Sequence, residues 1–126
     1  MPLDSPIRVL LVDDNETVRR GLSILLEAYD DLALAGEAAD GETAVSLCAQ
    51  VHADIIIMDV MMPGMDGIQA TRLIRARYPH LKVILLSTFL DTELLLEARQ
   101  SGALAYLSKS SPPGKLIETI RKAYEG

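Results

Sequence analysis

The stretch VLLVDDNE, residues 9–16, runs four apolar side chains directly into acidic ones. An unbroken apolar run of this kind is typical of a strand that is buried on both faces of a parallel sheet. Adjacent carboxylates repel each other, so Asp13 and Asp14 need either a structural role at the start of a helix or a functional one. The stretch therefore predicts a buried strand with a candidate site at its end.

Short apolar segments alternate with segments of helical spacing along the whole chain. The expected strands are residues 7–12, 32–37, 55–58, 83–87 and 104–107. Apolar residues recur at helical spacing in residues 18–29 and 116–124, and three more helices are expected to begin near Gly41, Gly67 and Thr92. Five alternations predict an α/β fold with a flavodoxin-like, doubly wound parallel sheet of order 2-1-3-4-5 and five helices on both faces.

Length and charge narrow the classes of function. The 126 residues match one domain, expected to span residues 1–126, and the net charge of −6 makes the chain a poor partner for DNA by itself. No apolar run is long enough to span a membrane, and the first residues, MPLDSPIR, lack the features of a secretory signal, so we expect a cytoplasmic protein. A single cysteine and two histidines offer no disulfide and no zinc site.

Three acids should meet at one edge of the predicted sheet. In a sheet of this order the ligand crevice lies beyond the carboxyl ends of the first and third strands. Asp13 and Asp14 follow the first of these strands and Asp59 follows the third. Two carboxylates about 5 Å apart repel by about 3 kcal/mol at an effective dielectric near 20, and Mg²⁺ would neutralise them. Capping of the first helix is the alternative for Asp13 or Asp14, but it does not explain Asp59, which precedes a loop.

Two other strand ends add groups that bind phosphate. The fourth predicted strand ends in Ser87 and Thr88, and the fifth leads to Lys109. Each residue alone would be read as a polar strand end or a surface charge. Together with three acids at the same edge, a hydroxyl and an ammonium predict a site for a metal ion and a phosphoryl group.

Four motifs carry a family resemblance: LLVDDNE, DIIIMDVMMPGMDGI, VILLST and GALAYLSKSSPPGKLIETI. By these motifs the chain resembles, over nearly its whole length, the receiver domain of bacterial two-component response regulators. The resemblance implies that Asp59 accepts a phosphoryl group from a phosphohistidine of a sensor histidine kinase, or from a small donor such as acetyl phosphate. It also implies that Asp14 binds Mg²⁺ or Mn²⁺ directly, that Asp13 acts largely through water, and that the carbonyl of Met61 is a further ligand.

The same resemblance assigns the remaining polar residues of the site. Lys109 would pair with the acyl phosphate and Ser87 would hydrogen-bond to it, while Tyr106 would turn inward as Ser87 moves. Such a domain is not a classical enzyme, but it catalyses its own phosphorylation and later dephosphorylation at Asp59. Without that context, Tyr106 would be read as an ordinary half-buried aromatic residue.

The segment LALAGEAADGETAV and the absence of proline directly after Lys109 resemble the LuxR/FixJ-type subgroup. Members of this subgroup carry a helix-turn-helix output domain that binds DNA. We therefore expect such a domain to follow Gly126 in a longer transcription regulator, and contact with DNA only through it. A stand-alone receiver is the alternative.

Several residues depart from the pattern of that subgroup. Thr88 stands where alanine is common, and it is expected to narrow access to the phosphorylation site. Leu90 and Leu104 replace residues that are usually polar, and Leu94 lies nearby in the fourth helix. If exposed, they would make the face of the fourth helix, fifth strand and fifth helix apolar, which predicts a homodimer through that face. The alternative is that these leucines fold back into the core.

Other functions of the same fold require motifs that this chain lacks. A flavodoxin has a loop rich in Ser, Thr and Gly after the first strand, and a nicotinamide-binding domain needs G-x-G-x-x-G there. A phosphatase of the haloacid dehalogenase type expects Asp-x-Asp, but Asp59 is followed by Val60 and Met61. The remaining alternative is a protein-binding module that has the receiver fold and takes no phosphate.

Overall fold

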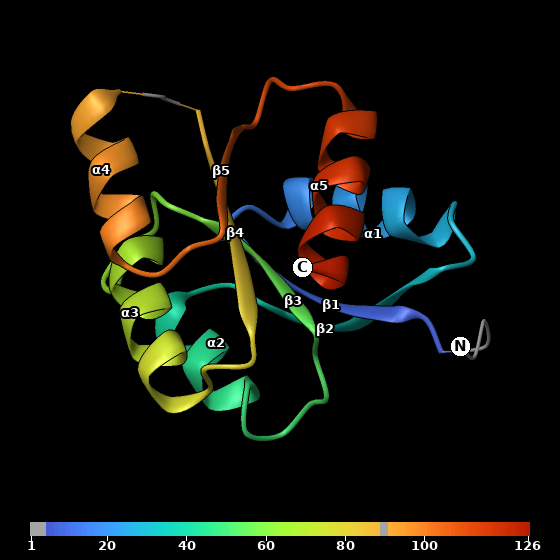
Figure 1. The fold of residues 1–126 in the computed structure, drawn as a ribbon, viewed down its shortest axis with the longest axis horizontal. Helices are drawn as coiled ribbons and strands as arrows, with labels where there is room; N and C mark the ends of the chain where they lie inside the picture. Colours follow the sequence, from blue (N-terminus) through green and yellow to red (C-terminus); the bar gives the residue numbers. More distant parts are fainter. Residues whose placement is uncertain (1–4, 89–90) are drawn as a thin grey trace.

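A five-stranded parallel sheet with helices on both faces forms the molecule (Figure 1). The computed structural model describes residues 5–88 and 91–126. The strands are β1 (Ile7–Val12), β2 (Leu32–Ala38), β3 (Ile55–Asp59), β4 (Lys82–Ser87) and β5 (Ala105–Ser108), in the order β2-β1-β3-β4-β5. The helices are α1 (Glu16–Glu27), α2 (Gly41–Leu47), α3 (Gly67–Arg77), α4 (Thr92–Gln100) and α5 (Pro113–Glu125). The predicted fold class and strand order are confirmed.

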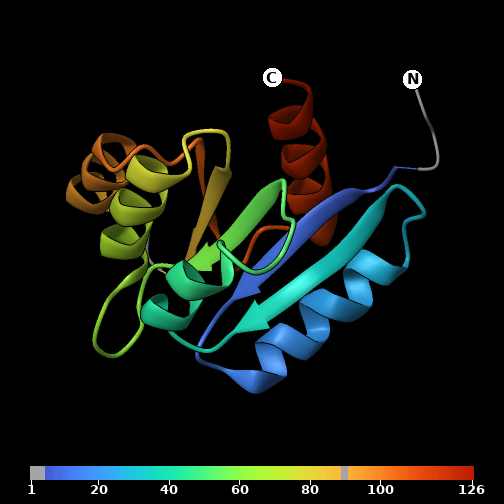
Figure 2. The same cartoon turned by 90° about the horizontal axis from the view of Figure 1, so that it is seen from below.

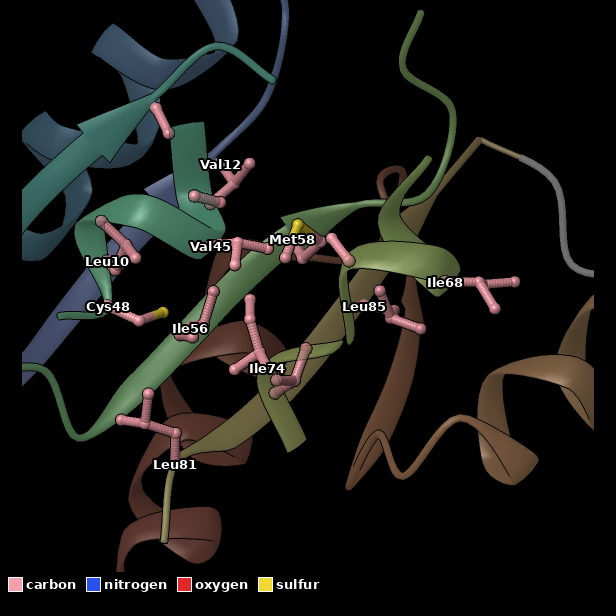
Figure 3. Packing of buried hydrophobic residues seen from close by; sticks show 14 of the residues in the cluster. Leu10, Val12, Val45, Cys48, Ile56, Met58, Ile68, Ile74, Leu81 and Leu85 are labelled. Atoms are coloured by element: carbon pink, nitrogen blue, oxygen red, sulfur yellow. The ribbon is translucent and has the colours of Figure 1, made fainter. Parts of the chain in front are cut away.

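The central strands are apolar on both sides because a layer of helices covers each face of the sheet. Along β1, Leu10 points into a core shared with α2, α3 and α4, and its neighbour Leu11 points into a second core shared with α1 and α5. On β3, Ile56 and Ile57 divide in the same way, following the two-residue period of a strand. Figure 2 shows the twisted sheet with α2, α3 and α4 grouped together, and Figure 3 shows the packing of the first core.

None of the helices in the described part of the chain has the length and apolar character that crossing a bilayer requires.

Four of the five strands differ from the sequence prediction by one residue at one or both ends. β2 continues to Ala38, β3 includes Asp59 itself, β4 begins one residue early, and β5 is Ala105–Ser108 instead of residues 104–107. Leu104 is 55% exposed and precedes the pairing of Ala105 with Ile84, so its apolar side chain does not mark a buried strand position. The apolar pattern of the sequence was misleading there because an edge strand tolerates an exposed leucine.

Asn15, and neither of the acids before it, caps helix α1. Its side-chain oxygen accepts a hydrogen bond from the N–H of Val18 at 3.1 Å. The expectation that Asp13 or Asp14 caps this helix is therefore wrong. Asp13 Oδ1 instead accepts the N–H of Asn15 at 2.9 Å, which leaves the second oxygen of Asp13 for other partners.

The start of α3 packs directly on the end of β3. A Cβ atom at Gly67 would lie 2.1 Å from the carbonyl oxygen of Asp59, and the N–H of Gly67 donates to the carbonyl of Val60 at 2.9 Å. A side chain at position 67 would therefore push the helix away from the strand residue that carries the candidate site.

We predict that Gly67→Ala destabilises the protein by about 1–3 kcal/mol, because the added Cβ would collide with the backbone at the end of β3 and push α3 away from it. Gly21→Ala is the matched control. Gly21 lies inside α1, where an added Cβ meets nothing within 4 Å, so its replacement should stabilise the protein by about 0.5–1 kcal/mol. Urea denaturation of both variants measures the difference, and equal effects of the two substitutions would contradict the packing argument.

Candidate functional site

Parallel pairing brings the carboxyl ends of the strands to one edge of the sheet. In the registers observed, Val12 lies opposite Met58, and Asp59 lies opposite Leu86. The main chain continues this order beyond β5, because the N–H of Lys109 donates to the carbonyl of Ser87 at 2.8 Å. Residues from four separate strand ends are thereby held at neighbouring positions.

Three carboxylates converge at this edge. Asp13, Asp14 and Asp59 each present an oxygen, and these atoms all lie within 4.8 Å of one another. Asp13 and Asp59 are buried, at 2% and 4% exposure, whereas Asp14 is exposed. The structure thus brings together the three acids that the sequence placed after the first and third strands.

Lys109 supplies the positive charge within this group. Its Nζ lies 2.8 Å from Asp13 Oδ2 and 3.2 Å from Asp59 Oδ2. Burial lowers the pKa of the Lys109 ammonium, but its hydrogen bond to Asp13 and the charges of the two carboxylates outweigh burial, so its pKa is raised overall. Lys109 is therefore held protonated between the two buried acids.

One ammonium does not fully compensate for the charge of the acids. Burial and the neighbouring charge of Asp13 raise the pKa of the Asp59 carboxyl, although Lys109 and the N–H of Met61 lower it. The Met61 N–H lies 3.3 Å from Asp59 Oδ1. The ionised form of Asp59 is thus disfavoured in the absence of further positive charge.

The donor set fits a hard divalent cation. Carboxylate oxygens are the ligands that Mg²⁺ and Mn²⁺ prefer, and one exposed acid beside two buried ones leaves space for coordinating water. The uncompensated charge at Asp59 gives a cation a favourable electrostatic environment. Three oxygens within 4.8 Å of one another can be spanned by a single ion.

Arg19 also belongs to this region, although no motif of the sequence pointed to it. Its guanidinium donates from Nη1 to the carbonyl of Asp13 at 2.6 Å and from Nε to Glu37 at 3.3 Å. The spacing in the sequence could have indicated it, because Arg19 lies one turn after Asn15 and so projects toward the strand ends from the first turn of α1. The sequence could not show which acceptor it would reach.

The other residues singled out in the sequence lie around the acids. Ser87 is fully buried at the end of β4, and Thr88 is exposed directly after it. The Met61 side chain is 57% exposed beside Asp59. Tyr106 is half-buried in β5 and packs against the core shared with α2, α3 and α4.

The three leucines expected near the fourth helix have different environments. Leu104 is exposed, and Leu94 is half-buried against the core, as the alternative interpretation held. Leu90 lies outside the described residues. Leu95 and Leu96, at 43% and 55% exposure, were not predicted to be at the surface, because a run of three leucines in a helix does not show which of them faces the sheet.

Comparisons with known proteins identify the family of this chain. The family described as "Response regulator receiver domain" matches residues 9–121. The transcriptional regulatory protein LiaR of Bacillus subtilis (strain 168) is 43% identical over 120 residues, which are 95% of this chain and 57% of LiaR. The chain therefore spans just over half the length of this curated relative.

Solved structures match over nearly the whole chain. A two-component response regulator of the LuxR family from Aurantimonas sp. SI85-9A1 is 35% identical, with a TM-score of 0.92, over 97% of this chain and 87% of that one. A CheX–CheY–BeF3–Mg²⁺ complex from Borrelia burgdorferi matches at 26% identity and a TM-score of 0.85, over 95% and 90% of the two chains. The chain belongs to the response regulator receiver family of two-component systems, in its LuxR-type subgroup.

Proposed function

We propose that this receiver is a phosphorylation-dependent switch in which Asp59 accepts a phosphoryl group from the phosphohistidine of a sensor histidine kinase, or from a small donor such as acetyl phosphate. The observation that carries the proposal is the convergence of Asp13, Asp14 and Asp59 on one another, with Lys109 bridging two of them. A purely structural domain has no use for three neighbouring carboxylates, two of which are buried.

In the proposed reaction an oxygen of the Asp59 carboxylate attacks phosphorus, the bond between phosphorus and the donor breaks, and an acyl phosphate forms. The Lys109 ammonium, 3.2 Å from Asp59 Oδ2, is placed to pair with the negative oxygens of the incoming group. Ser87, at the adjacent strand end, would hydrogen-bond to the same group, and Thr88 would set how freely donors and water enter. Hydrolysis at the same site later restores the carboxylate.

We propose that Mg²⁺ or Mn²⁺ is bound by Asp13, Asp14, Asp59 and the carbonyl of Met61. When bound, the ion supplies positive charge to a reaction in which negative charge accumulates on phosphoryl oxygens. The complex of Borrelia CheY contains Mg²⁺ together with BeF3, and its similarity to this chain supports the assignment. Asp14 is proposed as a direct ligand, and Asp13, which pairs with Lys109, as one that acts largely through water.

The proposed output passes through the face formed by α4, β5 and α5. Movement of Ser87 toward the phosphoryl group would make room for Tyr106 to turn inward, and this changes the surface that partners contact. Two curated relatives are described as transcriptional regulatory proteins, and the matched region makes up 57% and 55% of their lengths. We propose that a helix-turn-helix domain, contributed by a longer chain, makes the contact with DNA, and that the receiver works in the cytoplasm.

A receiver-like module that binds proteins without accepting phosphate is the alternative. It would need neither Lys109 between two buried acids nor a third acid beside them. The acyl phosphate proposal accounts for all of these groups, and the two functions differ in their dependence on a phosphodonor.

Incubation with acetyl phosphate and Mg²⁺ should add the mass of one phosphoryl group, detected by intact-protein mass spectrometry. Asp59→Asn should abolish the addition, because an amide is not a nucleophile for this transfer. Asp40→Asn is the matched control, since Asp40 caps α2 and an asparagine side chain can accept the same hydrogen bond. Modification that persists without Mg²⁺ or in Asp59→Asn would contradict the proposal.

In the metal-free protein, Asp59→Asn should raise the free energy of unfolding at neutral pH. The pKa of Asp59 is raised in the folded state, so wild type loses stability as the pH rises from the usual carboxyl range, near 4, through the folded pKa. Asp59→Asn does not lose stability in this way, so the difference in the free energy of unfolding between the variant and wild type should shrink as the pH falls. Thermal denaturation with a chelator, at several pH values, tests this, and a variant that is less stable than wild type at neutral pH would refute it.

We further propose that the exposed leucines of α4, together with Leu104 directly before β5, form a homodimer contact after phosphorylation. Burial of each side chain would contribute about 1.5–3 kcal/mol before the cost of association. Light scattering should show a monomer that becomes a dimer with beryllofluoride and Mg²⁺. Leu104→Ser should prevent this, and Ile24→Ser, which removes a similarly exposed apolar side chain on α1, should not. A monomer in both states would rule out the dimer.

A further inference from the structure

Arg19 contacts the acidic site without offering it a ligand. Its side chain is only 17% exposed, and its guanidinium joins the carbonyl of Asp13, at 2.6 Å, to the carboxylate of Glu37, at 3.3 Å. We propose that Arg19 is a positioning residue that fixes the peptide group between Asp13 and Asp14, and so holds Asp14 in place for the divalent cation. This inference rests on the proposed function.

Asp13 is restrained at each of its other polar groups. Its N–H donates to the carbonyl of Ala38 at 3.1 Å, its Oδ1 accepts the N–H of Asn15 at 2.9 Å, and its Oδ2 accepts from Lys109 at 2.8 Å. These bonds hold the backbone and side chain of Asp13 but do not reach the exposed Asp14. The carbonyl of Asp13 and the N–H of Asp14 belong to one rigid plane, so a bond to that carbonyl sets the direction in which Asp14 leaves the strand.

Arg19 is held both at its backbone and at the end of its side chain. Its backbone N–H donates to the carbonyl of Asn15 at 3.1 Å within the first turn of α1, and Glu37 pairs with the guanidinium from β2. A planar guanidinium can serve two acceptors in fixed directions, which a lysine ammonium does less well. Arg19 therefore connects α1 and β2 to the peptide group between Asp13 and Asp14, in the loop after β1.

The neighbouring Arg20 supplies a control of equal charge. Its side chain is 73% exposed and pairs with Glu16 at 3.5 Å, one turn earlier on the same helix. Loss of either arginine removes one positive charge from the same part of the molecule. By charge alone, each loss would strengthen the binding of a cation to the acids. If Arg19 positions Asp14, its loss should instead weaken Mg²⁺ binding. This difference in sign separates the two explanations.

The test is isothermal titration calorimetry of Mg²⁺ into wild type, Arg19→Ala, Arg19→Lys and Arg20→Ala. Arg19→Ala should bind Mg²⁺ about 10-fold more weakly, as is usual when a group that orients a metal ligand is lost. Arg20→Ala should bind as tightly as wild type or slightly more tightly. Arg19→Lys keeps the positive charge but loses the planar guanidinium that serves two acceptors. Its affinity for Mg²⁺ should therefore lie between those of wild type and Arg19→Ala.

Unchanged or tighter binding by Arg19→Ala would overturn the inference. Thermal denaturation without Mg²⁺ first establishes that each variant is folded. If Arg19→Ala does not fold, Arg19→Lys decides the question, because it keeps the positive charge: weaker binding than wild type supports positioning, and wild-type affinity overturns it. Absence of Mg²⁺ binding in wild type, with no transfer from acetyl phosphate, would instead overturn the proposed function itself.

Discussion

The rest of the site depends on the mutual repulsion of carboxylates that the fold forces together. Asp13, Asp14 and Asp59 reach within 4.8 Å of one another, and two of them are buried. Each pair at such a separation repels by about 3 kcal/mol at an effective dielectric near 20. Lys109 offsets part of this repulsion, but burial and the charge of Asp13 together still raise the pKa of Asp59. The repulsion that is not offset favours the binding of a cation at this edge.

Such a cluster persists because the strands that carry it cannot move apart. β1 and β3 lie side by side in the middle of the sheet, and their side chains are buried in cores on both faces. Gly67 allows α3 to begin directly against the end of β3, and Asn15 begins α1 directly after the first acids. Apolar burial over the whole domain thus stabilises an edge that is locally unfavourable.

The acidic edge of the sheet and the proposed output face differ in how tightly they are held. Around Asp13, four hydrogen bonds from different elements restrain one residue. In α4, by contrast, Ala98 is the buried residue, and Leu95 and Leu96 remain exposed. A rigid site beside a lightly packed helix suits a switch, because a small change at the strand ends can alter the helix without disrupting the core.

The sequence by itself determined the fold and the meeting of the acids. Apolar runs record which strands are buried on both faces, and parallel topology then requires Asp13 and Asp59 to emerge at adjacent strand ends. Only the tertiary structure decided which side chains pair there: Asn15 and not an acid caps α1, Lys109 bridges Asp13 and Asp59, and Arg19 binds a carbonyl. Periodicity in a sequence reports the face on which a residue lies, whereas the choice among nearby partners depends on distances of a few ångströms that packing and sheet twist set.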